Sequence, residues 1–176
     1  MRALRVADRR VVQLADPSTG GSAQPYHAAL AAHTRAAAAE TTRLVAAIRR
    51  FAARSLNTLI SEHEAGGRRI VGVGIVVGSV VDPSTITNEH IRAHAEEGRL
   101  FRSLIEDAAN ERALPYDVVP EGAIYAAAST TLGRTQPQLR LQLAALGKVL
   151  GGRWRADEKT ATLAAWIQLA SGQRAS

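Results

Sequence analysis

The pattern of hydrophobic and polar positions predicts a long helix over residues 28–64. Apolar side chains recur there every three or four positions, and arginines fall on the opposite side. Thr34 offers a cap for a later start of this helix, and the pair Gly66–Gly67 supplies the glycines at which helices commonly end. The apolar stripe consists of Leu44, Ile48, Phe51 and Leu59.

A second pattern, the near-continuous β-branched run from Ile70 to Val81, predicts a strand. Because polar residues do not alternate with apolar ones in this run, we expect both of its faces to be covered.

Asn88 is placed to cap a helix that reaches Arg112, and a short strand is predicted over Leu114 to Val119. Residues 3–15 hold two short apolar runs, which indicate a hairpin or two short strands. Further helices are predicted over residues 121–132, 137–150 and 157–169.

This order of elements indicates the fold class. Strands that alternate with helices are typical of an α/β protein with a mixed, mainly parallel sheet covered by helices. A chain of 176 residues fits one domain better than two. We therefore expect a single α/β domain over residues 1–170 and a frayed C-terminal tail over residues 171–176.

Composition narrows the classes of function. The chain has no cysteine, which excludes disulfides, thiol catalysis and thiolate metal sites. No apolar segment follows the charged N-terminus, and the run from Ile70 to Val81 is too short to span a bilayer. The sequence therefore predicts a cytoplasmic protein with no membrane partner.

The formal net charge of +6 makes nucleic acid the expected partner, since strong basicity is typical of nucleic-acid binding. The alternative is a compositional origin. Nearly all the positive charge is arginine, with lysine only at Lys148 and Lys159, and an Ala- and Arg-rich chain encoded by a GC-rich genome would carry the same charge. The sequence also leaves a homodimer open.

Three aspartates come at the ends of predicted elements. Asp16 follows an apolar run, Asp82 ends the predicted strand, and Asp157 opens the last helix. Carboxylate oxygens are the ligands that Mg²⁺ prefers, and two such ions stabilise the attacking and leaving oxygens of phosphodiester cleavage. The three aspartates are therefore candidate catalytic and Mg²⁺-binding residues. The alternative is that they serve ordinary turns and helix caps.

The same blocks resemble the RuvC-type Holliday-junction resolvases of the RNase H-like superfamily. The loop from Asp16 to Gly20 is similar to the loop after that family's first strand. The strand ending at Asp82, with the helix begun by Asn88, is similar to its next acidic block, and Asp157 falls at its C-terminal acidic helix. The resemblance implies an RNase H-like fold and a Mg²⁺-dependent endonuclease that cleaves branched or structured DNA, with Asp16, Asp82 and Asp157 as its acids.

The chain departs from the family pattern at several points. Ser18 stands where glycine is usual, Thr160 stands where a second helix acid is expected, and residues 20–40 give little sign of the family's second and third strands. These departures indicate an altered or lost active site. The alternative function is therefore a non-catalytic module on the same fold, which binds nucleic acid with a steep salt dependence and cleaves nothing.

His90, His94 and Glu97 are spaced i, i+4 and i+7, so a helix would present them on one face. Two imidazoles and a carboxylate can bind Zn²⁺ or Fe²⁺. The alternatives are ordinary packed or solvated side chains and, because Arg92 and Arg99 are nearby, a phosphate site. A metal- or small-molecule-binding protein centred on these residues is thus a third hypothesis.

A glycine pair, Gly151–Gly152, is followed by a tryptophan between two arginines. Trp154 could stack on a base, and Lys159 lies one turn into the next helix, where an anion is favoured. The alternative is that Trp154 fills the core beneath the loop. The predicted nucleic-acid-binding residues are Arg92, Arg99, Arg153, Trp154, Arg155 and Lys159.

Overall fold

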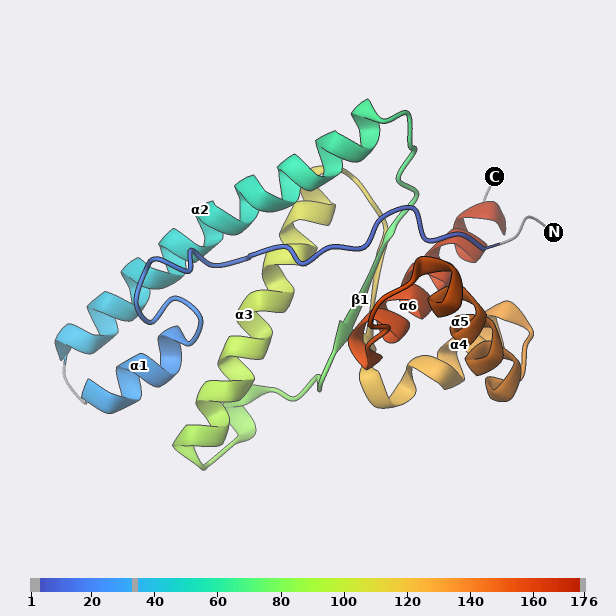
Figure 1. The fold of residues 1–176 in the computed structure, drawn as a ribbon. Coiled ribbons are helices and arrows are strands. Elements are labelled where there is room, and N and C mark those ends of the chain that lie inside the picture. The colour runs from blue at the N-terminus through green and yellow to red at the C-terminus, as the bar shows by residue number, and fades with distance from the viewer. Residues whose placement is uncertain (1–3, 33–34, 175–176) are drawn as a thin grey trace. The chain divides into compact units, whose positions relative to one another are not determined.

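A computed structural model describes residues 4–32 and 35–174 of the chain (Figure 1). The chain divides into two compact units, and neither is a continuous segment. We call Val12–Ile70 with Ser79–Arg112 the helical unit, and Met1–Val11, Val71–Gly78 and Ala113–Ser176 the strand unit. The chain passes from one unit to the other four times, after residues 11, 70, 78 and 112. The units are therefore not two successive segments of the sequence.

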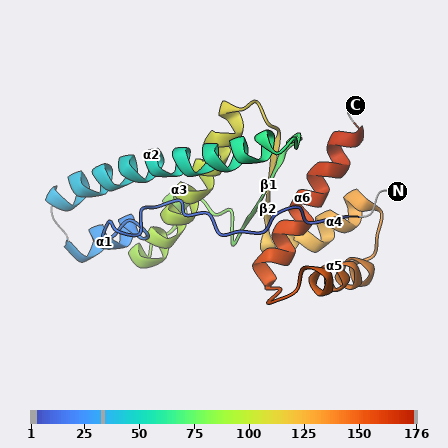
Figure 2. The ribbon, with the colours of Figure 1, turned by 45° about the horizontal axis from the view of Figure 1, so that its top comes forward.

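The helical unit consists of α1 (Pro25–Ala32), α2 (Arg35–Ala65), the 3-10 turn η1 (Pro83–Thr85) and α3 (Glu89–Glu111). Helix α1 lies against both α2 and α3, and α2 packs on α3 (Figures 1 and 2). The core between them is formed by Ile48, Ala52, Leu100 and Leu104. These side chains recur at helical spacing, and burying each large one contributes roughly 1.5–3 kcal/mol.

The predicted helix after Asn88 is confirmed, and the Asn88 side chain accepts a hydrogen bond from the Ile91 amide, as an N-cap does. The helix predicted over residues 28–64 is instead distributed over α1 and α2. Helix α1 starts earlier than predicted, at the buried Pro25, whose fixed φ suits a first helical position. Thr34, the predicted alternative cap, lies outside the described residues.

The strand unit is built on two parallel strands, β1 (Val73–Val77) and β2 (Tyr116–Pro120), with Ile75 opposite Val118. After β2 come the 3-10 turn η2 (Glu121–Ala123), α4 (Ile124–Leu132), α5 (Gln136–Leu150) and α6 (Ala156–Arg174). Helix α6 packs on both strands and on α4, and α5 packs on α4. The core of this unit includes Ile124, Leu139, Leu143 and Leu163. The α/β class and the parallel pairing are therefore confirmed.

Helix α6 approaches β1 closely because of Gly74. A Cβ atom at this position would lie 2.6 Å from the backbone carbonyl carbon of Ala164, which is closer than real Cβ contacts. Glycine within a strand often marks such a close approach of another backbone. Gly74 thus lets α6 cover the sheet at short range.

The strand predicted over residues 70–81 is shorter in the structure. Its last paired residue, Val77, lies opposite Pro120, which cannot donate a backbone hydrogen bond and at which β2 ends. Val80 and Val81 lie beyond the pairing and are exposed. The pattern of β-branched residues therefore continues past the point at which a partner strand exists.

The hairpin predicted within residues 3–15 is wrong, because the described part, residues 4–15, contains no strand. The two ends of this segment are held by other contacts. Leu14 and Ala15 pack against the core of the helical unit, and Arg9 donates to the Arg153 carbonyl oxygen in the strand unit. At the other terminus, α6 continues to Arg174, through much of the segment predicted to fray.

Within the part of the chain that the structure describes, no helix has the length and apolar character needed to cross a membrane.

Candidate metal centre

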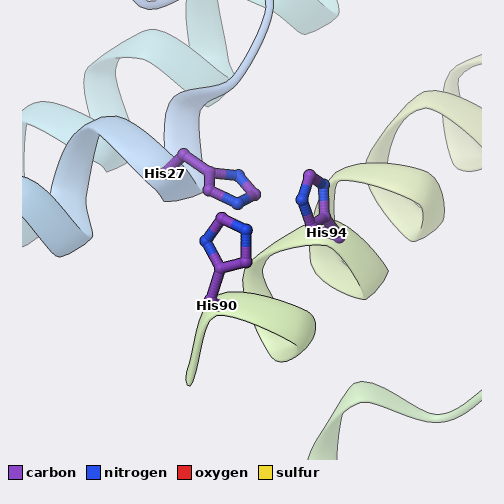
Figure 3. Close-up of side chains that lie close together, drawn as sticks. All are labelled: His27, His90 and His94. Atoms are coloured by element: carbon purple, nitrogen blue, oxygen red, sulfur yellow. The ribbon is translucent and has the colours of Figure 1, made fainter. Parts of the chain in front are cut away.

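Three histidines of the helical unit come together at the contact between α1 and α3. His27 comes from α1, and His90 and His94 come from successive turns of α3 (Figure 3). One ring nitrogen from each lies within 4.8 Å of the others, and the ring centroids are 4.1–4.8 Å apart. Among the described residues, this is the one group of three or more metal-ligating side chains whose ligand atoms lie close enough to share an ion.

Local sequence signals place these histidines. The Asn88 cap starts α3 at Glu89, so His90 falls in the first turn and His94 falls one turn later on the same face. Pro25 starts α1, which puts His27 in its first turn. Tyr26 beside it packs against the core of the helical unit, and this burial raises the pKa of the Tyr26 hydroxyl.

Glu97 of α3 fixes the orientation of His27. Its side chain is buried, at 8% exposure, and both of its carboxylate oxygens lie 2.9 Å from Nδ1 of His27. Glu97 Oε1 also accepts a hydrogen bond of 3.2 Å from the His27 backbone amide, one of the amides left free in the first turn of α1. Since a carboxylate can only accept, Nδ1 of His27 carries the proton.

In the neutral imidazole, the form that binds metals, this tautomer leaves Nε2 of His27 as an acceptor. Nε2 is buried and makes no hydrogen bond with any described residue. A buried polar atom without a partner costs roughly 1–3 kcal/mol. Metal-ligating histidines almost always donate the N–H of one ring nitrogen to a carboxylate, a backbone carbonyl or water while the other nitrogen binds the metal, and here that partner is a carboxylate.

The spacing suits a small ion after a modest closure of the side chains. In a tetrahedral zinc centre with Zn–N distances of about 2.0–2.1 Å, the ligand nitrogens lie about 3.4 Å apart. For the one nitrogen of each ring that lies within 4.8 Å of the others, the required approach is at most about 1.4 Å, and rotation of the imidazole rings also selects which nitrogen faces the ion. His90 and His94 are exposed, so one side of the cluster is open to solvent.

The sequence identified two of these three histidines. It assigned Glu97 as a third ligand, whereas the Glu97 carboxylate lies 3.9 Å from Nδ1 of His94 and contacts His27 instead. His27 was missed, because nothing in its local sequence links it to a helix that begins more than sixty positions later. A third histidine facing an i, i+4 pair is a tertiary contact that helical spacing does not contain.

Two of the three predicted catalytic aspartates lie in the helical unit, and each closes a tight turn. Asp16 accepts hydrogen bonds from the side chain and the amide of Ser18, and these bonds lower the pKa of Asp16. Asp82 caps η1 and accepts from the Ser84 amide, which likewise lowers the pKa of Asp82. These contacts are those of aspartates that stabilise turns.

The third aspartate, Asp157, lies in the strand unit. It is exposed in the first turn of α6, and one of its carboxylate oxygens is 3.4 Å from Arg155 Nε. Mg²⁺ binding by Asp16, Asp82 and Asp157 stays a prediction.

Several of the predicted nucleic-acid-binding residues have partners within their own unit. Arg92 and Arg99 form ion pairs with Glu89 and Glu96 one turn before them. Arg153 is exposed in the loop between α5 and α6, and its carbonyl oxygen accepts from Arg9.

Trp154, in the same loop, donates from Nε1 to the Leu143 carbonyl oxygen at 2.8 Å and packs against the core of the strand unit. Its ring lies so close to Gly147 that a Cβ at that glycine would be 2.5 Å from it. Trp154 is therefore fixed in position, and Lys159 lines a cavity beside it.

Comparison of the chain with protein-family models, with curated proteins and with solved structures finds no match.

Proposed function

We propose that the helical unit is a metal-binding module that holds a divalent transition metal, best matched by Zn²⁺, through His27, His90 and His94. The observation that carries this proposal is the buried Nε2 of His27, which has no hydrogen-bond partner and is left as the acceptor by the Nδ1–Glu97 contact. Three imidazoles form a ligand set that zinc uses, and imidazole also suits copper, nickel and iron.

In this proposal Glu97 is a positioning residue and not a ligand. Its contact with Nδ1 fixes the tautomer of His27 and makes the other nitrogen a better donor to a metal. Three ligands leave a tetrahedral ion with a fourth position, which water or a substrate can occupy from the exposed side of His90 and His94. The ion would also tie α1 to α3, since one ligand comes from α1 and two come from α3.

Zinc titration of the purified full chain, by calorimetry and by competition with a chelating dye, tests this proposal. We expect one ion per chain, with an affinity reduced at least about tenfold in His90→Ala and in His94→Ala. Both residues are exposed, so these variants keep the core intact. His63→Ala, which alters a histidine that contacts Arg68 near the end of α2, should bind zinc as the unaltered chain does.

Glu97→Gln isolates the positioning role. It keeps the size of the side chain but removes the charge, and loss of such an outer partner typically lowers metal affinity by roughly 10–100-fold. Zinc binding that is undetectable, or that is equal in the unaltered chain and in both His90→Ala and His94→Ala, would rule out the centre. Cobalt substitution offers a further readout, because its visible absorption distinguishes tetrahedral from octahedral nitrogen ligation.

The resemblance to resolvases supports a separate proposal, Mg²⁺-dependent cleavage of branched DNA on an RNase H-like scaffold. It requires Asp82 as a metal ligand, so Asp82→Asn should abolish cleavage of a four-way junction substrate. Equal cleavage by Asp82→Asn and the unaltered chain would contradict it. Because Asn can still cap η1, this variant separates chemistry from folding. DNA binding with a steep salt dependence and no cleavage would favour the non-catalytic alternative.

A further inference from the structure

A second candidate site lies in the strand unit, at a cavity of about 540 Å³ between α4, α5 and the start of α6. Pockets for small molecules commonly have volumes of about 300–1,000 Å³. This cavity is lined on its apolar side by Tyr125, Leu143 and Trp154. Charged side chains from three elements complete it, namely Glu121, Arg140 and Lys159.

The two cations of this cavity have no carboxylate partner among the described residues. Arg140 lies over the ring of Tyr125 at 4.1 Å from its centroid, and Lys159 makes no ion pair. Neighbouring arginines differ, since Arg9 pairs with Glu158 and Arg155 pairs with Asp157. The hydrogen-bond donors of Arg140 and Lys159 are therefore left for a ligand, whereas Arg9 and Arg155 are engaged with carboxylates.

The aromatic walls are held in place before any ligand binds. Trp154 already donates its indole N–H to the Leu143 carbonyl oxygen, so its ring offers the cavity apolar surface without a free donor. The Tyr125 ring is covered on one side by the Arg140 guanidinium. A flat aromatic group can pack against such fixed rings at a low entropic cost.

From this arrangement we infer that the cavity binds a small aromatic phosphate of mononucleotide size, with the phosphate on Arg140 and Lys159 and the ring beside Trp154. A phosphate monoester carries a charge of about −1.5 to −2 near neutral pH, which complements two cations. Arginine contacts such oxygens in a fork and lysine does so as a point charge. Glu121 lies at the same cavity and can accept from an amino group of the ligand.

Tryptophan fluorescence tests this inference in the full chain with Trp166→Phe, so that Trp154 is the reporter. We expect adenosine 5′-monophosphate and uridine 5′-monophosphate to change the emission saturably. Adenosine, which lacks the phosphate, and inorganic phosphate, which lacks the ring, should each bind at least about tenfold more weakly, since each loses one half of the contacts.

Matched variants locate the site. Arg140→Gln with Lys159→Gln should raise the dissociation constant of the monophosphates about tenfold or more. Lys148→Gln removes an exposed cation of α5 that does not line the cavity and should leave the dissociation constant unchanged. No saturable response to either monophosphate, or an equal loss in Lys148→Gln and in the double variant, would overturn the inference. Tighter binding of a short oligonucleotide than of its monophosphate would overturn it in favour of a nucleic-acid surface.

Discussion

Each unit of this protein buries a polar side chain on a helix, and the two networks differ in how they end. In the strand unit, Gln168 of α6 is buried and donates to the Asp117 carboxylate at 2.6 Å. In the helical unit, Glu97 of α3 is equally buried and contacts His27. The network of Gln168 ends at Asp117, which is exposed, whereas that of Glu97 ends at a buried nitrogen with no hydrogen-bond partner among the described residues.

This difference separates a structural polar contact from a candidate binding site. A buried polar network adds to stability when all its members are satisfied, and an unsatisfied member calls for a further partner. In the strand unit, Asp117 is exposed, so its carboxylate is open to solvent. Around His27, the rings of His90 and His94 lie 4.7 and 4.1 Å away between centroids, and imidazole is a common metal ligand. Two side chains of similar burial thus differ in whether their contacts end at a partner or at an unsatisfied atom.

The largest effect that we expect is stabilisation by zinc. A free Zn²⁺ concentration one hundred times the dissociation constant should raise the free energy of unfolding by about 2.7 kcal/mol, because the ion binds the folded chain. Chemical unfolding with and without a chelator measures this increase. His90→Ala should lose the increase, while Mg²⁺ at the same concentration should not produce it. If zinc raised the free energy of unfolding of His90→Ala by the same amount, the proposed zinc centre at His27, His90 and His94 would be contradicted.

A smaller effect is expected from the hydrogen bond between Gln168 and Asp117 in the strand unit. Gln168→Leu keeps most of the volume of the side chain but removes the donor to Asp117, and we expect a loss of about 1.5 kcal/mol in the free energy of unfolding. The zinc affinity of this variant should equal that of the unaltered chain, since Gln168 lies in the strand unit. Chemical unfolding and zinc titration of the same preparation measure both quantities. Weaker zinc binding by Gln168→Leu would contradict the expectation that the Gln168–Asp117 contact is independent of the zinc centre.

The sequence predicted those features that depend on neighbours within one element. The Asn88 cap follows from the local sequence, and the face shared by His90 and His94 follows from helical spacing. Of the predicted apolar stripe of α2, Leu44 and Ile48 are buried, whereas Phe51 and Leu59 are only partly buried. Features that depend on a second element were not predictable in this way. The true length of β1 depends on Pro120 of its partner strand, and the third histidine depends on how α1 packs against α3.

The same limit applies to the cavity of the strand unit. Trp154 and Lys159 were candidates because they are close in sequence, whereas Arg140 and Tyr125 come from two other helices and were not predicted. Sequence spacing could propose both an aromatic group and a cation, but it could not show which cations lack a carboxylate partner. That distinction needs the ion pairs of Arg9 and Arg155, which only the folded unit reveals.

The smallest effect concerns a polar contact that is exposed. The Ser84 amide lowers the pKa of Asp82 below its usual value of 3.8, so the capping contact stabilises the fold above that pH and is lost as the pH falls through the lowered pKa. Asp82→Ala should therefore be slightly less stable than the unaltered chain at pH 7, and the difference should shrink below about pH 3.8. Asp82→Asn retains a capping oxygen, so its stability should stay closer to that of the unaltered chain at neutral pH.

Thermal unfolding from pH 7 to pH 3 measures how the stability difference between Asp82→Ala and the unaltered chain changes with pH. A difference that grows toward acid would show that Asp82 does not act through its ionised carboxylate. Together with the cleavage assay on Asp82→Asn, this measurement separates the role of Asp82 in the turn from a role in chemistry.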